Sequence, residues 1–260
     1  MTAVRLDASG PLARLVLARP ERHNAIDLTM ARELQAALAE CATSPGVRAL
    51  LIGAEGPAFC VGGDLGHVGG DPDALRDIAR DMVEAVQDVV ARVAELPVPV
   101  VCAAGGAVAG VGLGLLWASD IVVAGDDLRL ATAFADVGVS GDGGSSWWLP
   151  RLVGLRRAQE LMLLNRRLDA READDWGLVT RVVPAVELAE EAERTAGELA
   201  SGATVALGRM RALLRDGVSA GLREHLAAEA DGVLACADSA DMREALRAFG
   251  ERRRPRFVGG

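Results

Sequence analysis

The first part of the chain alternates short apolar runs with longer segments whose apolar residues recur three or four positions apart. Apolar runs over 4–6 and 13–17 flank a Gly10-Pro11 turn, a pattern that predicts a β-hairpin. Further short segments dominated by apolar residues, each of which predicts a strand, cover residues 47–52, 98–102, 121–124, 128–131 and 179–183. Helical spacing predicts helices over residues 28–41, 72–93, 111–119, 155–165 and 170–176. The strand-strand-helix rhythm before residue 131 is typical of a repeated unit whose copies have diverged too far to be assigned from spacing.

Helix-start signals and a change of composition organise the rest of the chain. Asp71 followed by Pro72 predicts a helix N-terminus, and the capping-box sequence from Asp169 to Glu172 predicts another. After Pro184 no strand pattern remains, and the chain becomes rich in alanine, glutamate and arginine. From about residue 200 onward we therefore expect a helical C-terminal region.

Composition narrows the possible functions. The 260 residues fit one large domain, or a main domain with an appendage. The 28 basic residues are all arginine and face 37 acidic ones, and this net charge of −9 argues against a nucleic-acid-binding protein. Because the chain has no lysine, Schiff-base chemistry and a P-loop lysine are excluded. Its histidines are too scattered to indicate a metal site by spacing: His23, His67 and His225.

Several features bear on location. The four cysteines show no C-x-x-C pairing, which favours a reducing cytoplasm, and the N-terminus lacks the layout of a signal peptide. Leu96 to Ser119 is uncharged over a membrane-spanning length. Two prolines and five glycines break it into a β-rich run, a turn and a helix, which predicts buried core. We therefore expect a soluble cytoplasmic protein with no membrane segment.

Two glycine-rich segments, residues 58–65 and 105–114, follow predicted strands, and the second runs into a helix. Glycines let a ligand approach the backbone closely, and free N–H groups at a helix start favour negative charge. Tight strand–helix packing explains the same glycines equally well. A dinucleotide-binding fingerprint fits less well, because Gly112-Leu113-Gly114 has no third glycine at the required offset.

A third segment, residues 134–151, places Asp142 in a glycine loop before Trp147 and Trp148. An aspartate beside apolar surface has a raised pKa and can accept a proton near neutral pH. An Asx-type turn is the alternative interpretation, and for an isolated aspartate among glycines it is the more common one. Ser140 does not form a nucleophile elbow, because the order G-x-S-x-G is missing around it.

Taken together, six segments in register resemble the crotonase, or enoyl-CoA hydratase/isomerase, superfamily over essentially the whole chain. The segments are residues 19–26, 58–65, 105–121, 142–150, 173–183 and 249–257. The resemblance implies an α/β fold, a crotonase-like spiral of repeated ββα units with a helical C-terminal trimerisation region. Residues 1–199 would form the core that binds acyl-CoA, and residues 200–260 the oligomerisation region of a homotrimer or dimer of trimers.

The same resemblance implies an acyl-CoA thioester as substrate, with CoA as part of the substrate and neither a separate cofactor nor a metal. The N–H groups of Gly63 and Val111 would hold the thioester oxygen and stabilise an enolate. The CoA-binding positions would be Arg22, Ala25, Cys60, Gly62, Asp64, Leu65, Phe249 and Arg252. Bulky side chains of the third segment would wall the acyl pocket: Phe134, Trp147 and Trp148.

Two departures from the family pattern decide which reaction we expect. Hydratases of this family generally use two glutamates, and the matching positions here hold Gly114 and Phe134. Asp142 remains and matches the aspartate that moves protons in several family isomerases, so we expect a double-bond isomerase with Asp142, Gly63 and Val111 as its catalytic groups. A further departure is Ser140-Gly141, where relatives commonly have an apolar residue and proline before the aspartate.

Two other functions stay open at this point. Another enolate reaction, such as atypical hydration, thioester hydrolysis or C–C cleavage, could use His67, Asp71 or Asp73, although Asp71 is already explained as a helix cap. A non-catalytic acyl-CoA-binding subunit would account for the missing glutamates. Neither the acyl chain nor the pathway follows from the sequence.

Overall fold

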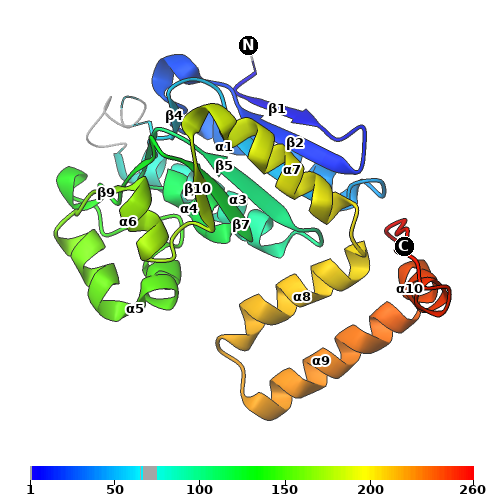
Figure 1. The fold of residues 1–260 in the computed structure, drawn as a ribbon. Helices are drawn as coiled ribbons and strands as arrows, with labels where there is room; N and C mark the ends of the chain where they lie inside the picture. Colours follow the sequence, from blue (N-terminus) through cyan, green and yellow to red (C-terminus); the bar gives the residue numbers. More distant parts are fainter. Residues whose placement is uncertain (1, 65, 67–74) are drawn as a thin grey trace.

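A computed structural model describes residues 2–64, 66 and 75–260 of the chain (Figure 1). Its strands are β1 (Val4–Asp7), β2 (Leu12–Leu17), β3 (Ala49–Ala54), β4 (Ala58–Cys60), β5 (Val100–Ala104), β6 (Ala107–Ala109), β7 (Ile121–Gly125), β8 (Arg129–Ala131), β9 (Leu168–Asp169) and β10 (Arg181–Val183). Its α-helices are α1 (Leu28–Thr43), α3 (Leu75–Glu95), α4 (Gly112–Ala118), α5 (Ser145–Leu163), α6 (Ala170–Asp175), α7 (Leu188–Ala200), α8 (Thr204–Gly217), α9 (Leu222–Ala237) and α10 (Ala240–Gly250).

The strands form two sheets that are built up turn by turn. The larger sheet has the order β1-β2-β3-β5-β7-β10, with an antiparallel β1–β2 hairpin and parallel pairing elsewhere. The smaller sheet has the order β4-β6-β8-β9. Each successive pair, β3/β4, β5/β6 and β7/β8, gives one strand to each sheet before the chain enters a helix. This arrangement confirms the expected α/β spiral of ββα units.

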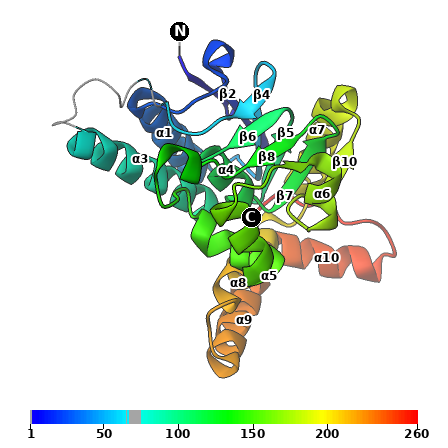
Figure 2. The ribbon, with the colours of Figure 1, turned by 90° about the vertical axis from the view of Figure 1, so that its left-hand side faces the viewer.

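The larger sheet is covered on both faces, so its strands are apolar on both sides. Leu50, Val100 and Cys102 face the main core, which they share with α1, α3 and α4. Their neighbours Ala49 and Val101 face the opposite way, against small residues of α7. Figures 1 and 2 show α7 on one side of the sheet and α1 and α3 on the other.

Helices α8, α9 and α10 extend away from the sheets (Figures 1 and 2). Arg211 fastens α8 to the core, since its guanidinium lies 2.6 Å from an oxygen of Asp120 and also donates to the carbonyls of Val93 and Leu96. These carbonyls belong to the C-terminal end of α3, where a cation is favoured. The expected helical C-terminal region is therefore present.

Most elements predicted from hydrophobic spacing are found within a few residues. The uncharged stretch 96–119 forms β5, β6 and α4 inside the core, and no helix in the described part of the chain is long and apolar enough to span a membrane. The helix predicted over 155–165 corresponds to the part of α5 that follows Gly154, and the part before Gly154 was not predicted. Helix α5 begins at Ser145 and is kinked at Gly154, and its early part carries Pro150, which hid the helical pattern.

Candidate active site

The first glycine segment leaves β4 and is held in place by the chain around Ile26. Ile26 donates its N–H to the Gly62 carbonyl (2.8 Å), and Asp64 donates its N–H to the Ile26 carbonyl (2.8 Å). Asn24, which is completely buried, fixes the approach to this point by donating to the carbonyl of Ala58. The Gly63 N–H, which lies between these two bonds, has no acceptor among the described residues.

The second glycine segment leads from β6 into α4. Val111 is the N-cap of α4, and in the described part of the chain no group accepts its N–H. The two segments lie against each other: a Cβ added to Gly62 would lie 3.1 Å from the Ala109 carbonyl oxygen and 3.5 Å from the Val111 nitrogen. The structure thus brings together the two segments whose N–H groups would be the oxyanion donors that the family resemblance implies.

Asp142 lies in the loop before α5, where Gly141, Gly143 and Gly144 all have positive φ. Its Oδ1 accepts the Gly143 N–H at 2.7 Å and the Gln87 side-chain amide, from α3, at 3.4 Å. Burial raises the pKa of Asp142, and these two hydrogen bonds offset part of the rise. The raised pKa makes the carboxyl a stronger base than an aspartate in water, which suits a group that accepts and returns a proton.

The Asp142 loop packs directly on the second glycine segment. A Cβ added to Gly143 would lie 3.2 Å from both the Cα and the carbonyl oxygen of Val111. A Cβ added to Gly114 would lie 2.6 Å from the Gly143 carbonyl oxygen and 2.8 Å from the Val90 side chain. Gly114, where the resemblance places one hydratase glutamate, therefore has no room for any side chain in this arrangement.

Phe134 is buried between the second segment and the Asp142 loop. Its ring would lie 3.9 Å from a Cβ on Gly110 and 3.8 Å from a Cβ on Gly141. The ring borders a hollow of about 430 Å³ between α5 and the segment before it, which Val139 and Met162 also line. This hollow is mostly apolar and adjoins the Asp142 loop.

The two tryptophans of α5 border a different hollow. Trp147 and Trp148 meet edge to face, with ring centroids 4.4 Å apart, and line a space of about 530 Å³ against the α8–α9 turn. Trp148 also contacts Gly144, where an added Cβ would lie 3.0 Å from its ring. Phe134 and the two tryptophans therefore border different hollows of the described chain, and the acyl pocket stays a prediction.

Part of the predicted CoA-binding set gathers at the end of β4. Arg22 lies 3.3 Å from the buried Asp64, and Arg19 reaches both Asp64 (3.3 Å) and the Ala25 carbonyl (2.7 Å). Cys60 is completely buried, and burial raises the pKa of its thiol to about 12, so it contributes backbone rather than a thiolate. Gly62 adjoins this group, whereas Leu65 lies outside the described residues.

The remaining two CoA-binding candidates are elsewhere in the chain. Phe249, at the end of α10, is 86 % exposed, and Arg252 follows just after that helix. Both views place α10 well away from β4 (Figures 1 and 2). His67, Asp71 and Asp73, the candidates for another enolate reaction, lie outside the described residues. Within residues 2–64, 66 and 75–260, no group of three or more His, Cys, Asp or Glu has the geometry of a metal site.

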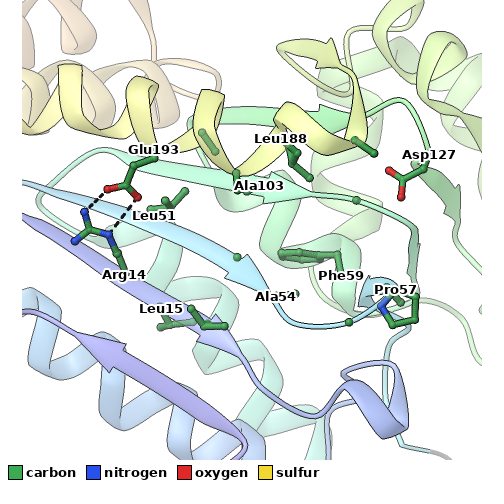
Figure 3. Close-up of a pocket in the computed structure, with 18 residues that line it drawn as sticks. Arg14, Leu15, Leu51, Ala54, Pro57, Phe59, Ala103, Asp127, Leu188 and Glu193 are labelled. Atoms are coloured by element: carbon green, nitrogen blue, oxygen red, sulfur yellow. Dashed lines mark hydrogen bonds and ion pairs between the residues drawn. The ribbon is translucent and has the colours of Figure 1, made fainter.

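A further hollow, of about 380 Å³, lies between α7 and the larger sheet (Figure 3). Leu188 and Glu193 of α7 line it on one side, and Glu193 pairs with Arg14 at one end. None of the predicted site residues borders this space. The catalytic candidates Asp142 and Val111 therefore lie away from this hollow, where α4 and the Asp142 loop meet.

Sequence reasoning missed Gln87 and Val90, which α3 contributes to the site. They are three residues apart and so lie on one face of the helix, next to the buried positions Val86 and Val89. In the sequence, Gln87 is only a polar residue next to apolar positions of a predicted helix. Nothing in its spacing indicates that it contacts the Asp142 loop.

Comparison with known proteins finds similar sequences and structures over nearly the whole chain. The family model described as enoyl-CoA hydratase/isomerase matches residues 7–260. A probable enoyl-CoA hydratase of Rhodobacter capsulatus is 35% identical over 98% of both chains, and 1,2-epoxyphenylacetyl-CoA isomerase of Escherichia coli is 35% identical over 94% of both. A crystal structure of a putative enoyl-CoA hydratase/isomerase from Mycobacterium abscessus has 38% identity and a TM-score of 0.92, with full coverage of both chains. Relatives with hydratase and isomerase names are equally similar, so the names do not decide the reaction.

Proposed function

The chain belongs to the enoyl-CoA hydratase/isomerase family, and from this premise we propose that it isomerises 3-enoyl-CoA thioesters to 2-enoyl-CoA thioesters. Asp142 is the only carboxyl group that we assign to the chemistry. The observation that carries the proposal is the contact between its loop and the second glycine segment, where Gly143 packs on Val111. This contact supports the proposal because it joins the Asp142 loop to the segment whose Val111 N–H would hold the thioester oxygen.

The proton shift needs one acid–base group that acts twice. Asp142 takes the proton from C2, and the electrons of the C2–H bond form a dienolate whose oxygen accepts the N–H groups of Gly63 and Val111. The carboxyl then gives the proton to C4, so that the double bond moves from C3–C4 to C2–C3. Preorganised backbone donors of this kind are commonly the largest stabilising contribution to enolate-like intermediates.

Hydration is less well supported, because it requires a second group to position and activate water. Neither Gly114 nor Phe134 can transfer a proton, and the space beside Gly114 is filled by the Gly143 backbone. One carboxyl with two N–H donors is sufficient for a 1,3-proton shift.

The decisive experiment compares wild type with Asp142→Asn on a 3-enoyl-CoA in deuterated water, with products analysed by mass spectrometry. We expect wild type to form the 2-enoyl thioester and the variant to lose about 10³-fold in turnover, as removal of a proton-transferring group does. CoA-ester affinity should be unchanged, since Asp142 is not assigned to the CoA site.

Other outcomes would replace the proposal. Equal turnover by both proteins would remove Asp142 from the mechanism. A product heavier by water would indicate a hydratase, and free CoA would indicate a hydrolase. Tight CoA-ester binding without any deuterium exchange would indicate a binding subunit.

We further propose that CoA is held by Arg22, Ala25, Cys60, Gly62, Asp64 and Leu65, with Phe249 and Arg252 supplied by a neighbouring subunit. The distance of α10 from β4 within one chain supports this division (Figure 1). A neighbouring subunit that supplies Phe249 and Arg252 requires an oligomer. We propose that this oligomer is a homotrimer or a dimer of trimers formed through residues 200–260. Phe134, Trp147 and Trp148 would wall the acyl chain only if it reached both hollows that these residues border, with Phe134 lining one and the two tryptophans the other.

We propose that no cofactor is needed beyond the CoA of the substrate. The four free cysteines favour a cytoplasmic location.

A further inference from the structure

Both hydrogen bonds to Asp142 end on the same oxygen. Gly143 donates its N–H to Oδ1 at 2.7 Å, and the Gln87 side-chain amide donates to Oδ1 at 3.4 Å. In the described part of the chain no protein group donates to Oδ2. The two carboxyl oxygens are therefore not equivalent.

We propose that Gln87 is a positioning residue for Asp142: with the Gly143 N–H it holds Oδ1, so that Oδ2 is the oxygen that takes the proton from C2 and returns it at C4. The inference rests on the proposed isomerase function and names an atom and a residue that this function did not require.

The arrangement suits both halves of the reaction. When Asp142 is ionised, Oδ1 accepts two N–H groups and Oδ2 is free to form a bond to the proton. When Oδ2 carries the proton, Oδ1 is the carbonyl oxygen of a neutral acid and still accepts both donors. The carboxyl can thus release and regain the proton without rotating or breaking a protein hydrogen bond, which keeps the reacting atoms in place.

The two donors are themselves held by the helix that starts at the predicted oxyanion donor. The Gly143 backbone packs on Val111 and Gly114 of that segment. Val90, one turn from Gln87 on α3, lies 2.8 Å from the position of a Cβ on Gly114. Gln87 and Gly143 therefore approach Asp142 from two elements that both rest on the start of α4.

Charged side chains that the structure describes on the surrounding elements do not position the Asp142 carboxyl or shift its pKa. Helix α4 has no ionisable side chain. On α3, Asp88 pairs with Arg92 and Glu84 is exposed, and on α5 Arg151 lies over the Trp147 ring. The neutral amide of Gln87 is thus the side chain that favours the ionised form of Asp142 and lowers its pKa against the effect of burial.

The test compares Gln87→Met, which keeps the length of the side chain without a donor, with Gln35→Met. Gln35, on α1, is the matched control. Its amide also contacts α3, where it donates to the Ala85 carbonyl, but it does not bind Asp142. Isomerisation of a 3-enoyl-CoA is followed over a range of pH, together with KM. Gln87 is exposed, so folding should be preserved.

We expect Gln87→Met to lower kcat about tenfold, as loss of a hydrogen bond to a charged group does, with KM nearly unchanged. The acidic limb of its pH profile should move to higher pH, because Asp142 then loses a group that lowers its pKa. Gln35→Met should behave as wild type. A Gln87→Met enzyme with the kcat and pH profile of the control would overturn the proposal.

A second measurement separates this inference from the proposed function. The Asp142 carboxyl carbon is titrated by NMR in protein labelled at aspartate, and its signal is the one that Asp142→Asn removes. A higher Asp142 pKa in Gln87→Met supports the contact even if wild type does not isomerise, an outcome that would refute only the isomerase assignment. An unchanged pKa would refute the role of Gln87, whatever the reaction.

Discussion

Asp142 is a carboxylate whose surroundings favour its protonated form. Burial raises its pKa more than the Gly143 and Gln87 hydrogen bonds lower it. A group with a raised pKa in the folded state makes folding less favourable once the pH exceeds its unfolded pKa, because the native state then binds more protons than the unfolded one. The proposed catalytic residue is therefore expected to reduce the stability of the fold near neutral pH.

The prediction at the scale of this residue is that Asp142→Asn raises Tm at pH 7. Asparagine keeps an Oδ1 acceptor for the same two donors but carries no charge. The gain should disappear as the pH falls below about 4, where the unfolded aspartate is also protonated. Thermal melts of both proteins over a pH series check this, and a variant that is less stable than wild type at pH 7, or a gain that grows toward acid, would contradict it.

At the scale of an element, α4 depends on two glycines that let it approach both loops of the site. A Cβ on Gly112 would lie 2.5 Å from the Cys60 carbonyl oxygen, and one on Gly114 would lie 2.6 Å from that of Gly143. Both distances are shorter than a Cβ tolerates against backbone. The helix can therefore touch β4 on one side and the Asp142 loop on the other only without side chains at these positions.

We predict that Gly114→Ala displaces the Asp142 loop and lowers kcat about 100-fold, since misplacement of a catalytic group by about 1 Å has effects of this size. KM should change little, because the nearest neighbours of a Cβ on Gly114 are Gly143 and Val90, which are not among the predicted CoA-binding residues. Gly197→Ala, on α7, is the control, as its Cβ would meet nothing within 4 Å. Unchanged kcat in Gly114→Ala would show that the loop accommodates the methyl group without loss of alignment.

The elements that the sequence predicted well are those whose pattern is local. Strands such as β5 and helices such as α1 carry their periodicity within one segment, and the capping box at Asp169 gives the observed start of α6, with the carboxylate accepting the Glu172 N–H at 2.9 Å. The early part of α5 was missed because Pro150 and glycines mask its pattern. Gln87 was missed because its meeting with the Asp142 loop depends on tertiary packing.

At the scale of the whole molecule, the C-terminal helices expose many large apolar side chains, and apolar patches on a surface commonly mark interfaces with other proteins. The exposed large apolar side chains of α8, α9 and α10 are Met210, Leu214, Leu222, Leu226, Val233, Leu234, Met242, Leu246 and Phe249. Together with the separation of α10 from β4, they support the proposed assembly, in which one subunit completes the CoA site of another.

We predict that the double variant Leu226→Glu/Val233→Glu is a monomer of 27.0 kDa. The two residues are seven positions apart and so share a face of α9, and they are 51% and 68% exposed in the single chain. Burying two carboxylates in a subunit interface without partners costs several kcal/mol, which is enough to dissociate it. Analytical ultracentrifugation of wild type, the double variant and Val186→Glu checks this. Val186→Glu is the control, because Val186 lies before α7, outside the C-terminal helices, and is 93% exposed.

The monomer should also bind substrate less well if Phe249 and Arg252 act across a subunit boundary. Asp142, Gly63 and Val111 all lie in residues 1–199, so kcat should fall less than the affinity for CoA esters. The double variant is therefore expected to show a KM raised about tenfold or more, the effect of losing one or two phosphate contacts. A monomer with the KM of wild type would place the whole CoA site within one chain, and a wild type that is itself monomeric would refute the assembly.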